Sequence, residues 1–140
     1  MDTQLFAERK IVIYSPSNYE PVQHLTALLE AAGIFKVIAI DRLDEDENCL
    51  QDSYAVVVFI TPTDFPRAMF LTNTVVKIVR ESNVEKLAWV APSAEENSGL
   101  ERGLSKAAEI ANNSGLYNLI LRHAPVFSDL LFFNKEIKYR

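Results

Sequence analysis

Residues 11–23, IVIYSPSNYEPVQ, show most clearly how this chain folds. Its first four residues form a continuous apolar run, which is typical of a β-strand covered on both faces. The polar residues that follow make a turn, and Pro21 then stands in a first helical turn, where its missing N–H does no harm. A buried strand that leads through a turn into a helix is the unit from which parallel α/β sheets are built.

The same unit recurs along the chain. Segments with apolar residues at helical spacing lie between the apolar runs, and Gly33 and Gly115 follow two of them as helix stops. SGLE, residues 98–101, fits the capping-box pattern of a helix start. The acidic stretch 41–53 is the exception, and we expect it to link the second and third strands tightly. The predicted strands are 10–15, 35–40, 54–60, 86–91 and 116–122, and the predicted helices are 20–32, 66–82 and 99–113.

This alternation predicts an α/β fold. We expect a doubly wound, parallel, five-stranded sheet of strand order 3-2-1-4-5, with helices on both faces, because strand–helix–strand crossovers are right-handed and few topologies remain. A chain of 140 residues fits a single domain. Ligands of such sheets bind at the carboxyl ends of the strands beside the reversal of strand order, here between the first and fourth strands.

Composition excludes several classes of protein. An apolar content of 49% and a charged content of 24% are ordinary for a soluble globular chain, and no apolar run approaches the roughly 20 residues that span a bilayer. The net charge of −5 argues against nucleic-acid binding. Cys49 has no second cysteine for a disulfide, and no His, Cys, Asp or Glu spacing indicates a metal site. With no signal-peptide pattern at the start, we expect a cytoplasmic protein.

Three segments resemble the NmrA-like branch of the atypical short-chain dehydrogenases/reductases. They are KIVIYSPSNYEPVQHLTALLEAAG, the stretch from YAVVVFITPTDFPRA to KLAWVAPS, and SKAAEIANNSGLYNLILRHAPVFSDLL. The resemblance implies a Rossmann-like fold with NAD or NADP as the usual ligand, and members that either reduce substrates or sense the nucleotide. It also implies a single domain over residues 1–140, without the substrate-binding portion into which longer members continue.

The family's glycine-rich phosphate turn falls on SPSNYEPV, residues 15–22, which contains no glycine. Glycines allow the backbone to approach a diphosphate closely, whereas Pro16 and Pro21 fix the backbone and remove two N–H donors. An ordinary strand-to-helix turn is the alternative. The remaining candidate donors are Ser15, Ser17 and Asn18, together with the helix N-terminus.

Further cofactor contacts are expected after the second and third strands. Asp41 stands where an acidic residue bonds the ribose of NAD, and Arg42 would suit a 2′-phosphate. The acidic run 44–47 that follows repels a polyphosphate, so a solvated acidic loop remains the alternative. Thr61 and Pro62, in the TPTDF loop, complete the candidate set.

The catalytic pattern of the family is incomplete. Lys106 matches the family's lysine, but Arg102 stands where classical relatives have the proton-donating tyrosine, and arginine stays protonated. The usual hydroxyl after the fourth strand falls on Ala91 or Pro92, with Ser93 one position late. Lys106 is therefore a weak catalytic candidate, with a surface helix residue as the alternative.

These observations favour a non-catalytic binding or regulatory module with at most a residual NAD(P) pocket. The alternative is an NAD(P)-dependent oxidoreductase with an unorthodox turn. A receiver-like signalling domain fits poorly, because Thr61 stands where that class needs an aspartate and Asp64 follows three residues later. We also expect a protein partner or a homodimer, unless the C-terminal helix folds back over its own sheet. The apolar residues of that helix are Val126, Phe127, Leu130, Leu131 and Phe133.

Overall fold

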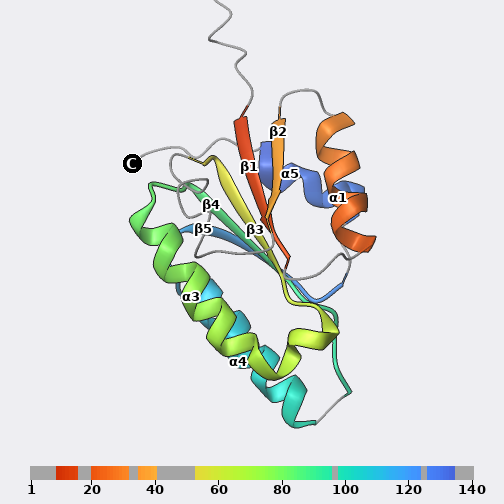
Figure 1. Ribbon diagram of the computed structural model, residues 1–140, viewed down its shortest axis with the longest axis vertical. Coiled ribbons are helices and arrows are strands. Elements are labelled where there is room, and N and C mark those ends of the chain that lie inside the picture. Colours follow the sequence, from red (N-terminus) through yellow and green to blue (C-terminus); the bar gives the residue numbers. More distant parts are fainter. Residues whose placement is uncertain are drawn as a thin grey trace, which may run out of the picture.

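The computed structural model describes residues 9–15, 20–31, 35–40, 53–95, 98–123 and 126–134, without the side chains of Phe127 and Asn134. The elements alternate as predicted (Figure 1). In chain order they are β1 (Arg9–Tyr14), α1 (Glu20–Ala31), β2 (Phe35–Ile40), β3 (Ala55–Phe59), the 3₁₀ helix η2 (Pro62–Arg67), α3 (Ala68–Glu81), β4 (Lys86–Val90), α4 (Gly99–Asn112), β5 (Tyr117–Leu121), the 3₁₀ turn η3 (Phe127–Asp129) and α5 (Leu130–Asn134).

The five strands form one parallel sheet, which confirms the predicted doubly wound α/β class. In chain numbering the order across the sheet is β2-β1-β3-β4-β5. From β1, the sheet extends to β2 on one side and to β3, β4 and β5 on the other, so the order reverses between β1 and β3. Burial explains why β3 lies beside β1. Every residue of β3 is buried, as a central strand requires, whereas Lys36 and Ala39 of β2 are exposed, as an edge strand permits.

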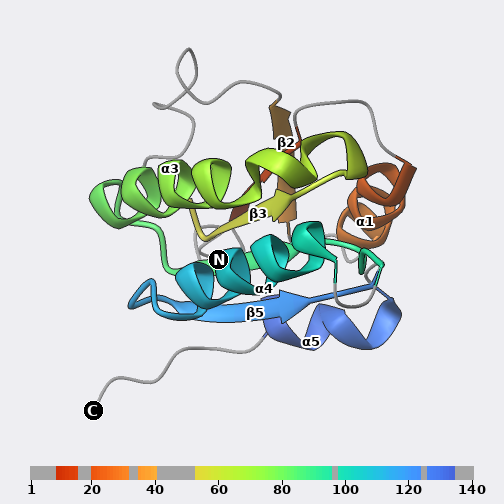
Figure 2. The same ribbon diagram turned by 90° about the horizontal axis from the view of Figure 1, so that it is seen from below.

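Helices cover both faces of the sheet (Figures 1 and 2). On one face, α1 and α5 pack on Ile11, Ile13 and Val57. On the other face, α3 and α4 pack on Val12, Val56 and Trp89. The sheet therefore separates two apolar cores, as in the three-layer α/β architecture.

The start of the helical segment after β3 differs from the sequence prediction. A helix was predicted from residue 66, but a 3₁₀ helix already begins at Pro62 and α3 follows from Ala68. Pro62 and Pro66 lack the N–H that an α-helix uses, which favours a short 3₁₀ segment here. The stop predicted after the last long helix is confirmed, because Gly115 has a φ of +86°, a value that favours glycine.

Candidate functional site

The carboxyl ends of β1 and β3 are where a doubly wound sheet presents its ligand site, because the strand order reverses between them. The site was expected between the first and fourth strands, and the observed order moves it to β1 and β3. Ser15 directly follows β1, Thr61 follows β3 after Ile60, and both are buried. Pro62 begins η2 and is exposed. Ser17, Asn18, Asp41 and Arg42 lie outside the described residues.

The polar groups of Ser15 and Thr61 bond within the chain. The Ser15 N–H donates to the Ile40 carbonyl at 3.1 Å, which continues the sheet past the end of β1. The Thr61 hydroxyl donates to Asp64 Oδ2 at 2.8 Å, and the Asp64 N–H donates to the Thr61 carbonyl at the same distance. Asp64 is itself buried. Thr61 and Asp64 of the loop after β3 therefore bond each other.

An ion pair occupies the carboxyl ends of β4 and β5. Arg122, which follows β5, donates from Nη1 to Glu101 Oε2 at 2.9 Å and from Nη2 to Oε1 at 2.8 Å. Its Nε donates to the carbonyl of Ala91, which follows β4, at 3.1 Å. The guanidinium carbon also lies 6.0 Å from the centre of the buried Trp89 ring. Two parallel bonds between guanidinium and carboxylate form the strongest geometry available to such a pair.

Glu101 gathers further donors at the start of α4. Its Oε1 accepts from the Ala94 N–H at 3.0 Å, and its Oε2 accepts from the Ser105 hydroxyl at 3.3 Å. The pKa of Glu101 is lowered from 4.5 to about 2. The hydrogen bonds from Arg122 are the largest cause, and the bond from the Ala94 N–H lowers the pKa less. Glu101 is therefore a carboxylate at neutral pH.

The N-terminus of α4 thus has its own anion. Helix N-termini attract negative charge through their free N–H groups, and Glu101 stands in the first turn of α4. The predicted capping box is half confirmed, because Ser98 Oγ accepts from the Glu101 N–H at 3.1 Å. The Glu101 side chain, however, bonds Arg122 and Ala94, and the Ser98 N–H donates to the Glu95 carbonyl at 3.1 Å instead. Neither Glu101 nor Arg122 was predicted from the sequence as a site residue, although the capping-box pattern marks Glu101.

The catalytic candidate Lys106 lies away from this edge. It is exposed in the middle of α4 and lines a shallow groove of about 470 Å³ between α3 and α4. Arg102 and Glu109 are exposed on the same helix. The structure brings Ser15 and Thr61 to neighbouring strand ends, but it places Lys106 in another part of the molecule.

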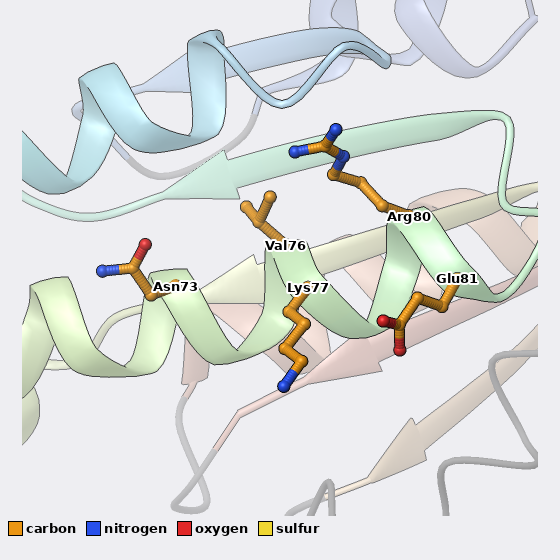
Figure 3. A pocket seen from close by; sticks show the side chains of 5 residues that line it. All are labelled: Asn73, Val76, Lys77, Arg80 and Glu81. Carbon is orange, nitrogen blue, oxygen red and sulfur yellow. The ribbon is translucent and has the colours of Figure 1, made fainter.

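The α3–α4 groove, which no sequence pattern predicted, contains residues of both helices. Asn73, Val76 and Arg80 of α3 face Lys106, Glu109, Ile110 and Asn113 in or directly after α4. A second hollow of about 440 Å³ adjoins it and adds Lys77 and Glu81. Figure 3 shows Asn73, Val76 and Arg80 pointing to one side of α3, and Lys77 and Glu81 to the other.

A buried lysine supports the C-terminal helix on the opposite face. Lys86 begins β4 with no exposed surface, and its Nζ donates to the carbonyls of Phe132 at 2.5 Å and Phe133 at 3.3 Å. The Nζ also lies 4.6 Å from the ring centre of Tyr54, whose hydroxyl donates to the Phe133 carbonyl at 2.7 Å. A lysine at the start of an apolar strand gives no sequence signal of such a role.

The C-terminal helix folds back over the sheet. Leu130 and Phe133 are buried in the core that α1 shares, whereas Leu131 is 71% exposed and Val126 is 49% exposed. The side chain of Phe127 lies outside the described part. Of the two outcomes expected for this helix, folding back therefore holds for its buried residues, whereas Leu131 and Val126 remain exposed.

Three further polar side chains lie at the surface. His24 on α1 and His123 after β5 are exposed, as is Ser93. Cys49 lies outside the described residues. Among the residues whose placement is described, no group of three or more His, Cys, Asp or Glu side chains could hold a metal ion. In the same part of the chain, no helix combines the length and apolarity that crossing a membrane requires.

Comparison with known proteins assigns no family. No protein-family model matches the chain, and no curated protein is significantly similar to it. A proposal for the function therefore depends on the Rossmann-like fold and on the geometry described above.

Proposed function

We propose that this chain is a non-catalytic, NmrA-like module that acts as a binding or regulatory protein, with at most a residual NAD(P) pocket. The observation that carries the proposal is the Arg122–Glu101 pair at the carboxyl ends of the sheet. The pair lies at the ends of β4 and β5, on the same edge of the parallel sheet as the expected ligand site, and its two charged groups bond one another while the dipole of α4 already has the Glu101 carboxylate.

The phosphate turn supports the same proposal. The Ser15 N–H, which begins the turn, is bonded to Ile40, and Pro16 and Pro21 supply no N–H. A dinucleotide site depends on several free backbone N–H groups that converge on the diphosphate. This turn offers fewer of them than the glycine-rich version.

The helix that would carry the catalytic groups also supports it. Arg102 stands at the place of the proton donor, and Lys106 is exposed beside α3. A proton donor must reach the substrate and must titrate near neutral pH, which a guanidinium does not do.

Calorimetric titration with NAD, NADH, NADP and NADPH tests this proposal. We expect no saturable heat up to about 1 mM nucleotide and no oxidation of NADH or NADPH above the blank. The reductase alternative predicts low-micromolar binding that Asp41→Ala weakens, while Glu30→Ala, an exposed acid on α1, leaves it unchanged. Measured turnover, or binding with that pattern, would refute the non-catalytic proposal.

We further propose a homodimer through the C-terminal helix. The support is local, since Leu131 within α5 and Val126 just before η3 are exposed apolar side chains. Light scattering should give the mass of two chains, and Leu131→Glu should return it to that of one. Leu100→Glu, at an exposed leucine on α4, is the matched control and should leave the dimer intact. A wild-type mass of one chain at all concentrations would exclude the dimer.

A further inference from the structure

The α3–α4 groove has the form of a binding site for a third helix. Asn73, Val76 and Arg80 recur on α3 at spacings of three and four residues, which places them along one side of the helix. Lys106 and Ile110 are spaced likewise on α4, and Asn113 directly follows that helix. Two helical turns span about 11 Å, so the two rows form a groove of roughly that length.

The groove is apolar at its base. Val76 is almost fully buried, and Ile110, which is half buried, packs against the same core cluster. Asn73 and Asn113 are exposed and provide side-chain amides on the two helices. A helix that binds in a groove places apolar side chains on such a base and polar ones against the rim.

The rim is positively charged on an acidic protein. Arg80 and Lys106 are both exposed, and in the part of the chain that is described neither forms an ion pair with an acid. Glu109 is the acidic residue among those lining the groove. The whole chain has a net charge of −5, so two cations beside one carboxylate make this groove opposite in sign to the protein around it. Such a local field attracts a partner of negative charge.

We infer that the α3–α4 groove binds an acidic amphipathic helix of a partner protein. Its apolar side chains lie on Val76 and Ile110, and its carboxylates meet Arg80 and Lys106. The groove lies on the opposite face of the sheet from α5, so the surface is separate from the proposed dimer contact (Figures 1 and 2). This inference rests on the proposed function and names the partner chemistry of the binding module.

The test uses a fluorescein-labelled synthetic helical peptide with a leucine stripe flanked by glutamates. A second peptide has lysine at every glutamate position, and a single-stranded DNA oligonucleotide serves as a polyanion without a helix. Fluorescence anisotropy with the full chain gives the dissociation constants. We expect the acidic peptide to bind, with an affinity that falls as salt rises from about 0.1 M to about 1 M and the Debye length shrinks from about 10 Å to about 3 Å.

Matched charge reversals locate the binding. Arg80→Glu should weaken the acidic peptide about fivefold or more, since it removes one attraction and adds a repulsion. Lys36→Glu makes the same change of charge at an exposed position of β2 and should alter the affinity by less than about twofold. Both positions are exposed, and an unchanged urea midpoint will verify that each variant is folded.

Several results would overturn the inference. They are absence of binding by the acidic peptide, equal binding of the acidic and basic peptides, equal or tighter binding of the oligonucleotide, or an Arg80→Glu affinity equal to that of the wild type. A two-chain mass that Arg80→Glu reduces to one would assign the groove to a second copy of this chain. Nucleotide titration tests the proposed function separately, so the two can fail independently.

Discussion

The Glu101–Arg122 pair should stabilise the fold by an amount that depends on pH. Glu101→Gln keeps the size of the side chain and one acceptor for Ala94, but removes the charge that Arg122 binds. Because folding lowers the pKa of Glu101 from 4.5 to about 2, its contribution to the free energy of unfolding is fully present above about pH 5. The contribution is lost as pH falls toward 2, where the wild-type carboxylate is also protonated.

The magnitude follows from the pKa and the exposure. A pKa lowered from 4.5 to about 2 corresponds to at most about 3 kcal/mol at neutral pH. The side chains of Arg122 and Glu101 remain 26% and 22% exposed, so solvent screens the pair. We therefore expect Glu101→Gln to lower the free energy of unfolding by about 1 kcal/mol, well below the upper bound.

Urea unfolding followed by the fluorescence of Trp89, the single tryptophan, measures this difference. At about pH 7 the midpoint should fall by about 0.5 to 1 M, and near pH 2.5 most of the difference should disappear. Glu109→Gln, at an exposed glutamate of the same helix, is the control and should cost little. Equal stability of wild type and Glu101→Gln at neutral pH, or a difference independent of pH, would refute the role assigned to the pair.

Three further predictions use the same urea assay. Gly115→Ala should lower the free energy of unfolding by about 1 kcal/mol, because residue 115 has a positive φ. Gly103→Ala, inside α4 with open space around a new Cβ, should raise the free energy of unfolding by about 0.5 to 1 kcal/mol. Changes of the same sign in the two variants would contradict this account. Lys86→Met should cost about 1 to 3 kcal/mol, because it removes the donor to the carbonyls of α5, and an unchanged midpoint would show that α5 needs no such donor. Thr72→Val leaves the N–H of Trp89, 2.9 Å from the threonine hydroxyl, without that acceptor and should cost a similar amount; a neutral effect would mean that this bond contributes nothing.

Local pattern was enough to predict the elements. Apolar runs gave all five strands within one or two residues, because strands buried on both faces exclude polar side chains. Turn chemistry located Ser98 as a helix cap and Gly115 as a stop, because each satisfies a backbone requirement within a few residues. The start after β3 was missed, because two prolines favoured a 3₁₀ segment over an α-helical start.

Strand order needed more than the pattern of elements. The complete burial of β3 and the exposed Lys36 of β2 explain why β3 is central and β2 lies at the edge. The difference is visible in the two sequences, AVVVF and FKVIAI, because Lys36 interrupts the apolar run of the second. The expected ligand site depends on this order. Ser15 and Thr61 lie at the ends of β1 and β3, where the order reverses, whereas the reversal was expected between the first and fourth strands.

The amino-acid pattern was sufficient to predict which segments are strands and helices and where several of them end, because these choices depend on neighbours within a few residues. Only the tertiary structure decided the pairing of Arg122 with Glu101 and the burial of Lys86 beneath α5. Arg122 and Glu101 are 21 residues apart, and Lys86 reaches carbonyls 46 and 47 residues away. Charged side chains carry no periodic signal of their partners, so contacts over such separations arise only when the packing of the sheet brings the strand ends together.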